Sequence, residues 1–273
     1  VSFLNNLGVH ASGTKAFLNS FGMVNKEGKY NRMAYLLSDQ NEMIIKVMRF
    51  KGTDKNTFDQ RLTYDNQSLI LTVKEVLDYF KLINKPKRID AEAGTREETP
   101  LFDYQSFREA WINACVHTTW TENIPPSVYM YDDRIEVVSY GGLPFGLSKE
   151  GFYTGTSKPV NNRLFNIFIT CDFTEQSGHG IPRIVDHYGR EAFSFNDGIL
   201  KVTIPYGYVP DYVLARQAKN KIIDILTDNQ RNVLHYLAEN PYSSLQAVAD
   251  SCSLSLGGVK KIVGKLQEME LLE

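Results

Sequence analysis

The segment from Glu109 to Thr118 says more about the fold of this chain than any other stretch of the sequence. Residues four apart share one face of a helix, so Glu109, Asn113 and His117 form a polar stripe. The apolar residues between them, Trp111 among them, can be buried on another face. A carboxylate that can orient water and an amide oxygen that can bind Mg²⁺, one turn apart, suit a nucleoside triphosphate site.

Length and composition place the chain among ordinary globular proteins. Its 273 residues suggest about two domains, and its 42% hydrophobic content is enough for packed cores. The net charge of −2 and the pI near 6.3 exclude binding to nucleic acid or anionic membranes by bulk charge alone. A local basic patch is still compatible with these values.

The cysteines and the hydropathy pattern indicate where the protein works. Cys115, Cys171 and Cys252 lie far apart without a Cys-x-x-Cys pair, which argues against a zinc ribbon and fits a reducing cytosol. No apolar run is long enough to span a bilayer, and no secretory signal is visible. We therefore expect a cytoplasmic protein with no membrane partner. Because it begins with Val1 and ends at Glu273 directly after two leucines, we expect a piece of a longer protein.

The alternation of apolar and polar residues predicts a chain that mixes helices and strands. A strand is expected over residues 43–50, and hairpins turn at Asp132-Asp133 and at Asn196-Asp197-Gly198. After residue 227 three short helices are expected, opened by Thr227 or Asp228, by Ser244 and by Ser255. The remaining predicted helices cover residues 14–22, 67–83, 104–118, 164–169, 181–188 and 211–226.

Several short motifs occur in a fixed order along residues 15–208. They are Arg49 to Thr53, Arg108 to His117, Asp132 to Glu136, Gly141 to Leu147, Gly155 to Pro159 and Gly178 to Ile184. The set resembles the RecG-like C-terminal ATPase region of Schlafen-type AlbA proteins. That region is similar to the GHKL fold of gyrase, heat-shock chaperone 90, histidine kinases and MutL. The resemblance implies an α+β fold, a GHKL/Bergerat-like sandwich with helices on one face of a mixed sheet. No helicase motor is visible, because the nearest approach to a P-loop, residues 258–265, has a spacer one residue too long.

The resemblance also assigns roles to individual residues. In the GHKL family the helix that carries Glu-x-x-x-Asn supplies the general base and the Mg²⁺ ligand, here Glu109 and Asn113. Ser139 stands where the first glycine box has the aspartate that receives the adenine amino group, and Gly141 and Gly142 follow it. Gly178 and Gly180 form the second glycine box, which opens a helix whose free amides favour phosphate. Arg183 or Lys158 could add charge-assisted contacts, and residues 145–162 would form a mobile lid over ATP and Mg²⁺.

Each of these motifs taken alone has an ordinary explanation. Glu-x-x-x-Asn occurs on many exposed helices, His117 suits a helix end, and Asp132-Asp133 suits a hairpin turn. Glycine pairs occur in plain turns and loops. Ser139 is shorter than aspartate and uncharged, which favours a chain that has lost its nucleotide. Only the order of the motifs favours a binding site.

The last part of the chain, residues 228–273, resembles a winged helix-turn-helix without its wing strands. Residues 244–268 would contact DNA, with Lys260, Lys261 and Lys265 on phosphates and Ser255 near the bases. The acidic residues of this unit and the glycines of its last helix favour instead a protein-interaction or dimerisation role.

We therefore expect four segments along the chain. Residues 1–100 would lead into the ATPase-like domain, 101–208 would form the nucleotide-binding region, 209–226 a linker helix, and 227–273 a winged helix-turn-helix with a truncated wing. The expected function is a transcriptional regulator that combines ATP binding with DNA binding, with nucleotide, DNA and a second copy of the chain as partners. The alternatives are a weak Mg-dependent ATPase that acts on or with DNA, and a degenerate scaffold for dimerisation that binds no nucleotide.

Overall fold

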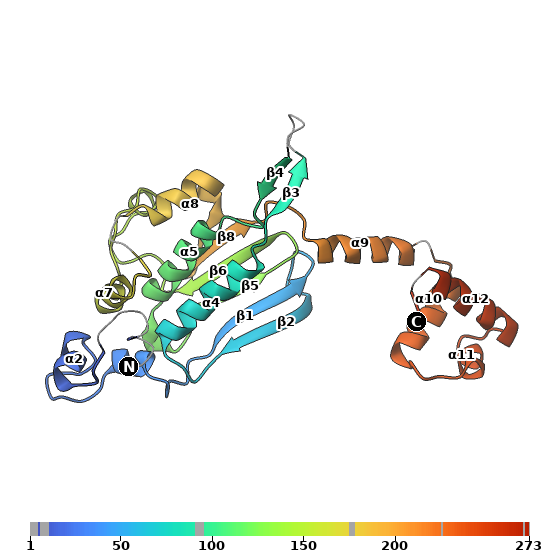
Figure 1. Ribbon diagram of the computed structural model, residues 1–273, viewed down its shortest axis with the longest axis horizontal. Coiled ribbons are helices and arrows are strands. Elements are labelled where there is room, and N and C mark those ends of the chain that lie inside the picture. The colour runs from blue at the N-terminus through green and yellow to red at the C-terminus, as the bar shows by residue number, and fades with distance from the viewer. Residues whose placement is uncertain are drawn as a thin grey trace. The chain divides into compact units, whose positions relative to one another are not determined.

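The computed structural model describes residues 5, 11–90, 96–174, 178–224, 226–269 and 271–272 (Figure 1). These residues form two compact units, Val1–Val209 and Pro210–Glu273, which we call unit 1 and unit 2. Unit 1 contains a mixed sheet with helices packed on it, and unit 2 is all-helical where it is described. The predicted α+β fold class is therefore confirmed.

The main sheet of unit 1 has six strands in the order β2-β1-β5-β6-β8-β7. Strands β1 and β5 run parallel and their other neighbours run antiparallel, which makes the sheet mixed. Both predicted hairpins are confirmed, and Asp197 and Gly198 take the positive φ values that a tight turn requires. The strands are β1 (Ile45–Lys51), β2 (Thr57–Tyr64), β5 (Ser127–Met130), β6 (Arg134–Tyr140), β7 (Phe193–Asn196) and β8 (Ile199–Pro205).

Two long helices, α4 (Leu69–Ile83) and α5 (Tyr104–His117), lie across one face of this sheet (Figure 1). Their apolar periodicity predicts both of them. Phe80 of α4 and Phe107 of α5 are fully buried, and their ring centroids lie 4.0 Å apart. Burying each such aromatic side chain stabilises the fold by about 1.5–3 kcal/mol. This packing fixes which side of α5 faces the core.

Shorter elements complete unit 1, and α6 (Lys149–Tyr153) and α5 both contact α8 (Gly180–Tyr188). The sequence patterns did not predict α6, α3, β2 or the separate two-stranded sheet of β3 and β4. The other bounds are α2 (Lys15–Ser20), α3 (Arg32–Leu37), β3 (Lys87–Asp90), β4 (Arg96–Thr99), α7 (Asn162–Thr170), η1 (Trp120–Glu122) and η2 (Arg190–Ala192).

Unit 2 consists of α9 (Asp211–Asp224), α10 (Asp228–Glu239), α11 (Leu245–Ser251) and α12 (Leu256–Glu268). The predicted caps are confirmed: Thr227 and Gln230 form a reciprocal capping box, and Ser244 and Ser255 each cap the helix that follows. The buried core residues are Leu226, Val233, Val248, Ala249, Val259 and Leu266. Within the described ranges, no helix is both long and apolar enough to cross a membrane.

Candidate functional site

A cleft in unit 1 lies along one side of α5, between that helix, strands β6 and β8, and the amino end of α8. It contains about 900 Å³ of space outside the protein atoms, part of it open to solvent. A mostly apolar lining with a few converging polar groups is typical of small-molecule sites. The polar and glycine residues of the lining include Glu109, Asn113, His117, Ser139, Gly142, Gly155, Lys158, Gly178 and Gly180.

Helix α5 turns its polar stripe toward the cleft because its apolar residues are held in the core. Phe107 and Trp111 are fully buried on the core side. Residues four apart share another face of the helix, so Glu109, Asn113 and His117 all line the cleft. At 1.5 Å per residue, the stripe extends over about 12 Å, which suits an elongated ligand better than a single ion.

At the amino end of α8, glycine lets the backbone approach Glu109 closely. A Cβ on Gly180 would lie 2.2 Å from Glu109 Oε2, so only glycine leaves this carboxylate in place. The Glu109 side chain is 20% exposed, and its Oε1 lies 3.6 Å from Arg108 Nη1. His179, the residue before α8, makes no capping hydrogen bond with its side chain. The amino end of an α-helix favours negative charge, so this end of the cleft suits a phosphate group.

The lid segment, residues 145–162, meets the second glycine box through a backbone contact. A Cβ on Gly155 would lie 2.0 Å from the Gly178 carbonyl oxygen, and both residues have positive φ values, +80° and +67°. A Cβ on Gly178 would in turn lie 2.8 Å from the Gly155 carbonyl oxygen, so the packing of the two segments accounts for glycine at both positions. The sequence explains the glycine at position 178 by close approach to a phosphate, but the structure explains it without a ligand.

The opposite end of the cleft lies where α5 ends beside β6, and its polar groups are neutral. The Thr119 amide donates to the Tyr140 carbonyl at 2.8 Å and joins the two elements. Burial lowers the pKa of His117 to about 4, so its imidazole is uncharged near pH 7. Nδ1 of His117 is buried and has no hydrogen-bond partner among the described residues. Ser139 Oγ makes one long hydrogen bond, to the Leu200 carbonyl at 3.5 Å.

Of the two basic side chains expected near phosphate, only Lys158 lines the cleft. Its ammonium donates to the Phe145 carbonyl at 2.6 Å, which links two parts of the lid segment. Arg183 lies in a neighbouring depression and makes an ion pair with Asp103 at 3.5 Å. Burial alone would raise the pKa of Asp103, but hydrogen bonds from Ser106 and Arg183 lower it overall. The expectation that Arg183 contributes to the cleft is therefore not supported.

Gly141 is the predicted nucleotide residue that does not line the cleft. Its amide donates to the Gly198 carbonyl at 2.7 Å, and a Cβ would lie 2.2 Å from Thr119 Oγ1. Its φ of +117° and this close contact explain the glycine without a ligand. The sequence predicts His117 in the polar stripe of α5 but assigns it no binding role, and its side chain lines the cleft. The apolar residues Val137 and Val202 also line it.

In unit 2 the predicted DNA-contacting residues lie on or before α12. Lys260, Lys261 and Lys265 are exposed. Ser255 is also exposed, but its hydroxyl accepts a hydrogen bond from the Gly258 amide at 3.1 Å as the cap of the helix. This capping role competes with the predicted contact to a base.

Comparisons with known proteins find a family match within each of the two units. Residues 124–199 match the family described as "Putative ATP-dependent DNA helicase recG C-terminal", and residues 226–273 match "Winged helix-turn-helix DNA-binding". The first match begins after α5, so Glu109 and Asn113 lie outside it. No curated protein matches the chain.

One solved structure, the DIP2311 protein from Corynebacterium diphtheriae, is similar with a TM-score of 0.55 at 16% sequence identity. The match covers 91% of this chain and 52% of that protein, so this chain spans about half its length. At this identity the similarity concerns the fold alone.

Proposed function

Because the chain joins a RecG C-terminal-like domain to a winged helix-turn-helix, we propose that it is a DNA-binding regulator whose unit 1 binds a nucleotide. The observation that supports nucleotide binding most directly is that Asn113 and the glycines 178 and 180 lie on different walls of one cleft. The phosphates would lie against the amino end of α8. The base would then lie toward His117 and Ser139, at the far end of α5.

The residues of the cleft fit a nucleotide that brings Mg²⁺ with it. Mg²⁺ keeps several waters and phosphate oxygens, so a single amide such as that of Asn113 is enough from the protein. No group of three His, Cys, Asp or Glu side chains suited to a metal occurs in the described part of the chain, so the metal would not be held by a protein cage. Bound Mg²⁺ would offset the repulsion between phosphate and the Glu109 carboxylate. Lys158 could exchange its hydrogen bond with Phe145 for a phosphate oxygen.

Calorimetry with ATP and Mg²⁺ tests this proposal. We expect heat of binding with the wild-type protein and at least a tenfold weaker affinity with Asn113→Ala, because the substitution removes the metal-binding amide oxygen. Asn166→Ala removes the same group from an exposed position on α7 and should bind like the wild type. Absence of heat with wild-type protein would contradict the proposal and leave the scaffold alternative.

The DNA half of the proposal depends on the exposed lysines of α12. Reversing Lys260 and Lys261 to glutamate should weaken duplex binding at least tenfold, and the salt slope should fall by about 0.9 for each phosphate that is no longer neutralised. Lys15→Glu with Lys26→Glu produces the same change in net charge on exposed residues of unit 1 and serves as the control. Equally weakened binding in both double variants would indicate a nonspecific charge effect.

Regulation would come from a nucleotide-linked population shift. The lid contains Lys158 and contacts the second glycine box at Gly178, so a ligand in the cleft can favour one lid conformation. The favoured form would bind DNA, or a second copy of the chain, with a different affinity. Measuring duplex affinity with and without ATP tests this coupling, and an unchanged affinity at saturating ATP would exclude it.

A second candidate function is ATP hydrolysis, and the position of Glu109 favours it. Its carboxylate lies against Gly180 at the amino end of α8, where the phosphates are proposed to lie. A carboxylate there can orient and deprotonate water. Glu109→Gln should then abolish phosphate release while ATP binding remains. Equal release rates in the variant and the wild type would exclude hydrolysis by this residue.

A further inference from the structure

The outer sheet face is the face of the six-stranded sheet that points away from α4 and α5. The register of the strands places Lys46, Arg61, Arg134 and Lys201 on it, and Glu136 is the carboxylate that shares it. Cations therefore outnumber carboxylates on this face, although the whole chain has a net charge of −2. Lys46 and Lys201 are half-exposed and Arg61 is exposed, so the face is accessible to solvent.

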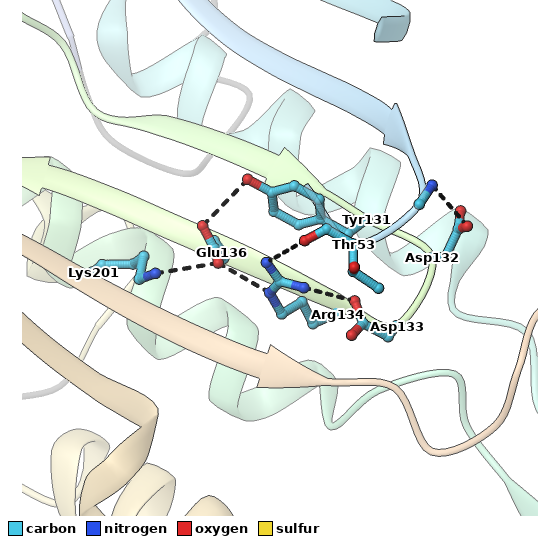
Figure 2. A network of polar contacts seen from close by, with 8 residues as sticks. Thr53, Tyr131, Asp132, Asp133, Arg134, Glu136 and Lys201 are labelled. Carbon is cyan, nitrogen blue, oxygen red and sulfur yellow. Dashed lines mark hydrogen bonds and ion pairs between the residues drawn. The ribbon is translucent and has the colours of Figure 1, made fainter. Parts of the chain in front are cut away.

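The single carboxylate of the outer sheet face is buried and shared between two of these cations (Figure 2). Glu136 is 6% exposed, and its Oε1 lies 3.0 Å from Arg134 Nε and 3.2 Å from Lys201 Nζ. Arg134 also pairs with Asp133 in the hairpin turn at 2.8 Å, so these two cations are balanced by two carboxylates, and the excess positive charge of the face comes from Lys46 and Arg61. Neither Lys46 nor Arg61 has an ion-pair partner within the described residues. The face is therefore positively charged, and Glu136 holds two of its cations in place.

Aromatic side chains lie between these cations. Phe58 is 55% exposed, and Tyr129 is half-exposed with Lys55 Nζ 3.6 Å above the centroid of its ring. Phe50 and Tyr131 are buried beside them and stack at 5.8 Å, so the exposed rings rest on a rigid base. Flat aromatic surfaces among cations are the chemistry with which proteins bind unpaired bases and their phosphates.

From this arrangement we propose that the outer sheet face binds single-stranded nucleic acid. Phosphates would lie near Lys46, Arg61 and Lys201, and bases would stack on Phe58 and, after displacing the Lys55 ammonium, on Tyr129. The aromatic rings favour a single strand over a duplex, because the bases of a duplex already stack on one another. The positive charge favours a nucleic acid over an apolar or basic partner. This surface shares no residue with the cleft or with α12, so the proposal does not depend on the function proposed above.

Fluorescence anisotropy with the full chain and labelled 20-nucleotide oligothymidine tests the proposal, with oligouridine of equal length to distinguish DNA from RNA. Lys46→Glu combined with Arg61→Glu should weaken binding at least about tenfold and lower the salt slope by about 1.4. Tyr129→Leu, which removes one stacking ring, should weaken binding about fivefold or more. Thermal unfolding of each variant shows whether the fold is retained.

Two control variants make the outcome specific. Lys15→Glu with Lys26→Glu carries the same charge change and should bind the single strand like the wild type. Lys260→Glu with Lys261→Glu should impair duplex binding and leave single-strand binding in place. The proposal is overturned if the outer-face variants bind like the wild type, or if the control on unit 1 loses as much affinity. Competition by polyglutamate at equal charge concentration would also overturn it, since the face would then bind any polyanion.

Discussion

In unit 1 the candidate ligand groups point into a cleft between α5 and α8, whereas in unit 2 the lysines of α12 point into solvent. Glu109, Asn113 and His117 are partly buried in the cleft, so replacing one of them disturbs both binding and folding. The exposed lysines have few neighbours, so replacing them changes charge with little effect on stability. In unit 2, mutations can therefore change binding without changing stability. In unit 1, a variant that changes binding must be checked for its effect on stability as well.

The glycines of the two units also differ in how closely other atoms surround them. A Cβ on Gly155 in the lid would lie 2.0 Å from a backbone oxygen, whereas a Cβ on Gly264 in α12 would have no atom within 4 Å. Glycine is required at the first position by space and by a φ of +80°. At the second position it is a helix-interior residue that lowers helix stability. A methyl group should therefore lower the unfolding free energy when added at Gly155 and raise it when added at Gly264.

Gly155→Ala should produce the largest effect. The added methyl group would displace the Gly178 backbone, so we expect unit 1 to lose roughly 3–5 kcal/mol of unfolding free energy together with nucleotide affinity. Gly28 has a similar φ of +78° but no atom within 4 Å of a Cβ, so Gly28→Ala reports the cost of the backbone conformation alone. Urea unfolding of both variants measures the difference, and equal destabilisation would show that the close approach of Gly155 to Gly178 does not matter.

His117 should make the stability of unit 1 depend on pH. Its pKa is about 4 in the folded protein and near the ordinary 6.5 when unfolded, so between these values the unfolded chain binds more protons. Stability from this group is therefore fully present above pH 6.5 and falls by about 3 kcal/mol on acidification to pH 4. His117→Gln should remove this part of the pH dependence, as measured by urea unfolding at pH 7, 5.5 and 4.

The matching control in unit 2 is His235→Gln, because the His235 side chain is 76% exposed. It should leave the acid-dependent destabilisation of unit 1 unchanged. An identical pH profile for the wild type and His117→Gln would contradict the buried, neutral state of this imidazole.

Gly264→Ala should change the unfolding free energy least, and it should stabilise the protein where Gly155→Ala destabilises it. Alanine replaces glycine inside α12 without a clash, so unit 2 should gain about 0.5–1 kcal/mol. Thermal unfolding monitored by helical circular dichroism measures it. Weaker duplex binding with unchanged stability would show instead that DNA approaches the α12 backbone closely at Gly264.

Much of the fold could be predicted from the sequence because the relevant signals are local. The caps Ser244 and Ser255 and the turn at Asp197-Gly198 each act within a few residues, and all are confirmed. Strand β2 was missed because it is an edge strand with mostly exposed residues, which weakens its alternation. Helix α6 was missed because it has only five residues.

The candidate site was less predictable because its geometry depends on contacts between distant segments. Gly141 and Gly142 are adjacent in the sequence, yet only Gly142 lines the cleft, while Gly141 packs on Thr119. The burial of His117 likewise depends on segments that the helix pattern alone cannot place. The roles of the cleft residues and the four predicted segment boundaries stay predictions.

The parallel pairing of β1 with β5 has a consequence for how the protein is made. Residues that pair across these two strands, such as Lys46 and Ser127, lie about eighty residues apart in the sequence. At the ribosome, the centre of the sheet cannot close until β5 has left the exit tunnel, so an early chain exposes the apolar side of β1 and α4. The described helices of unit 2 contact one another over shorter sequence separations than this strand pairing, so unit 2 should fold more quickly once synthesised. Of the two units, nascent unit 1 is therefore expected to depend more on a chaperone.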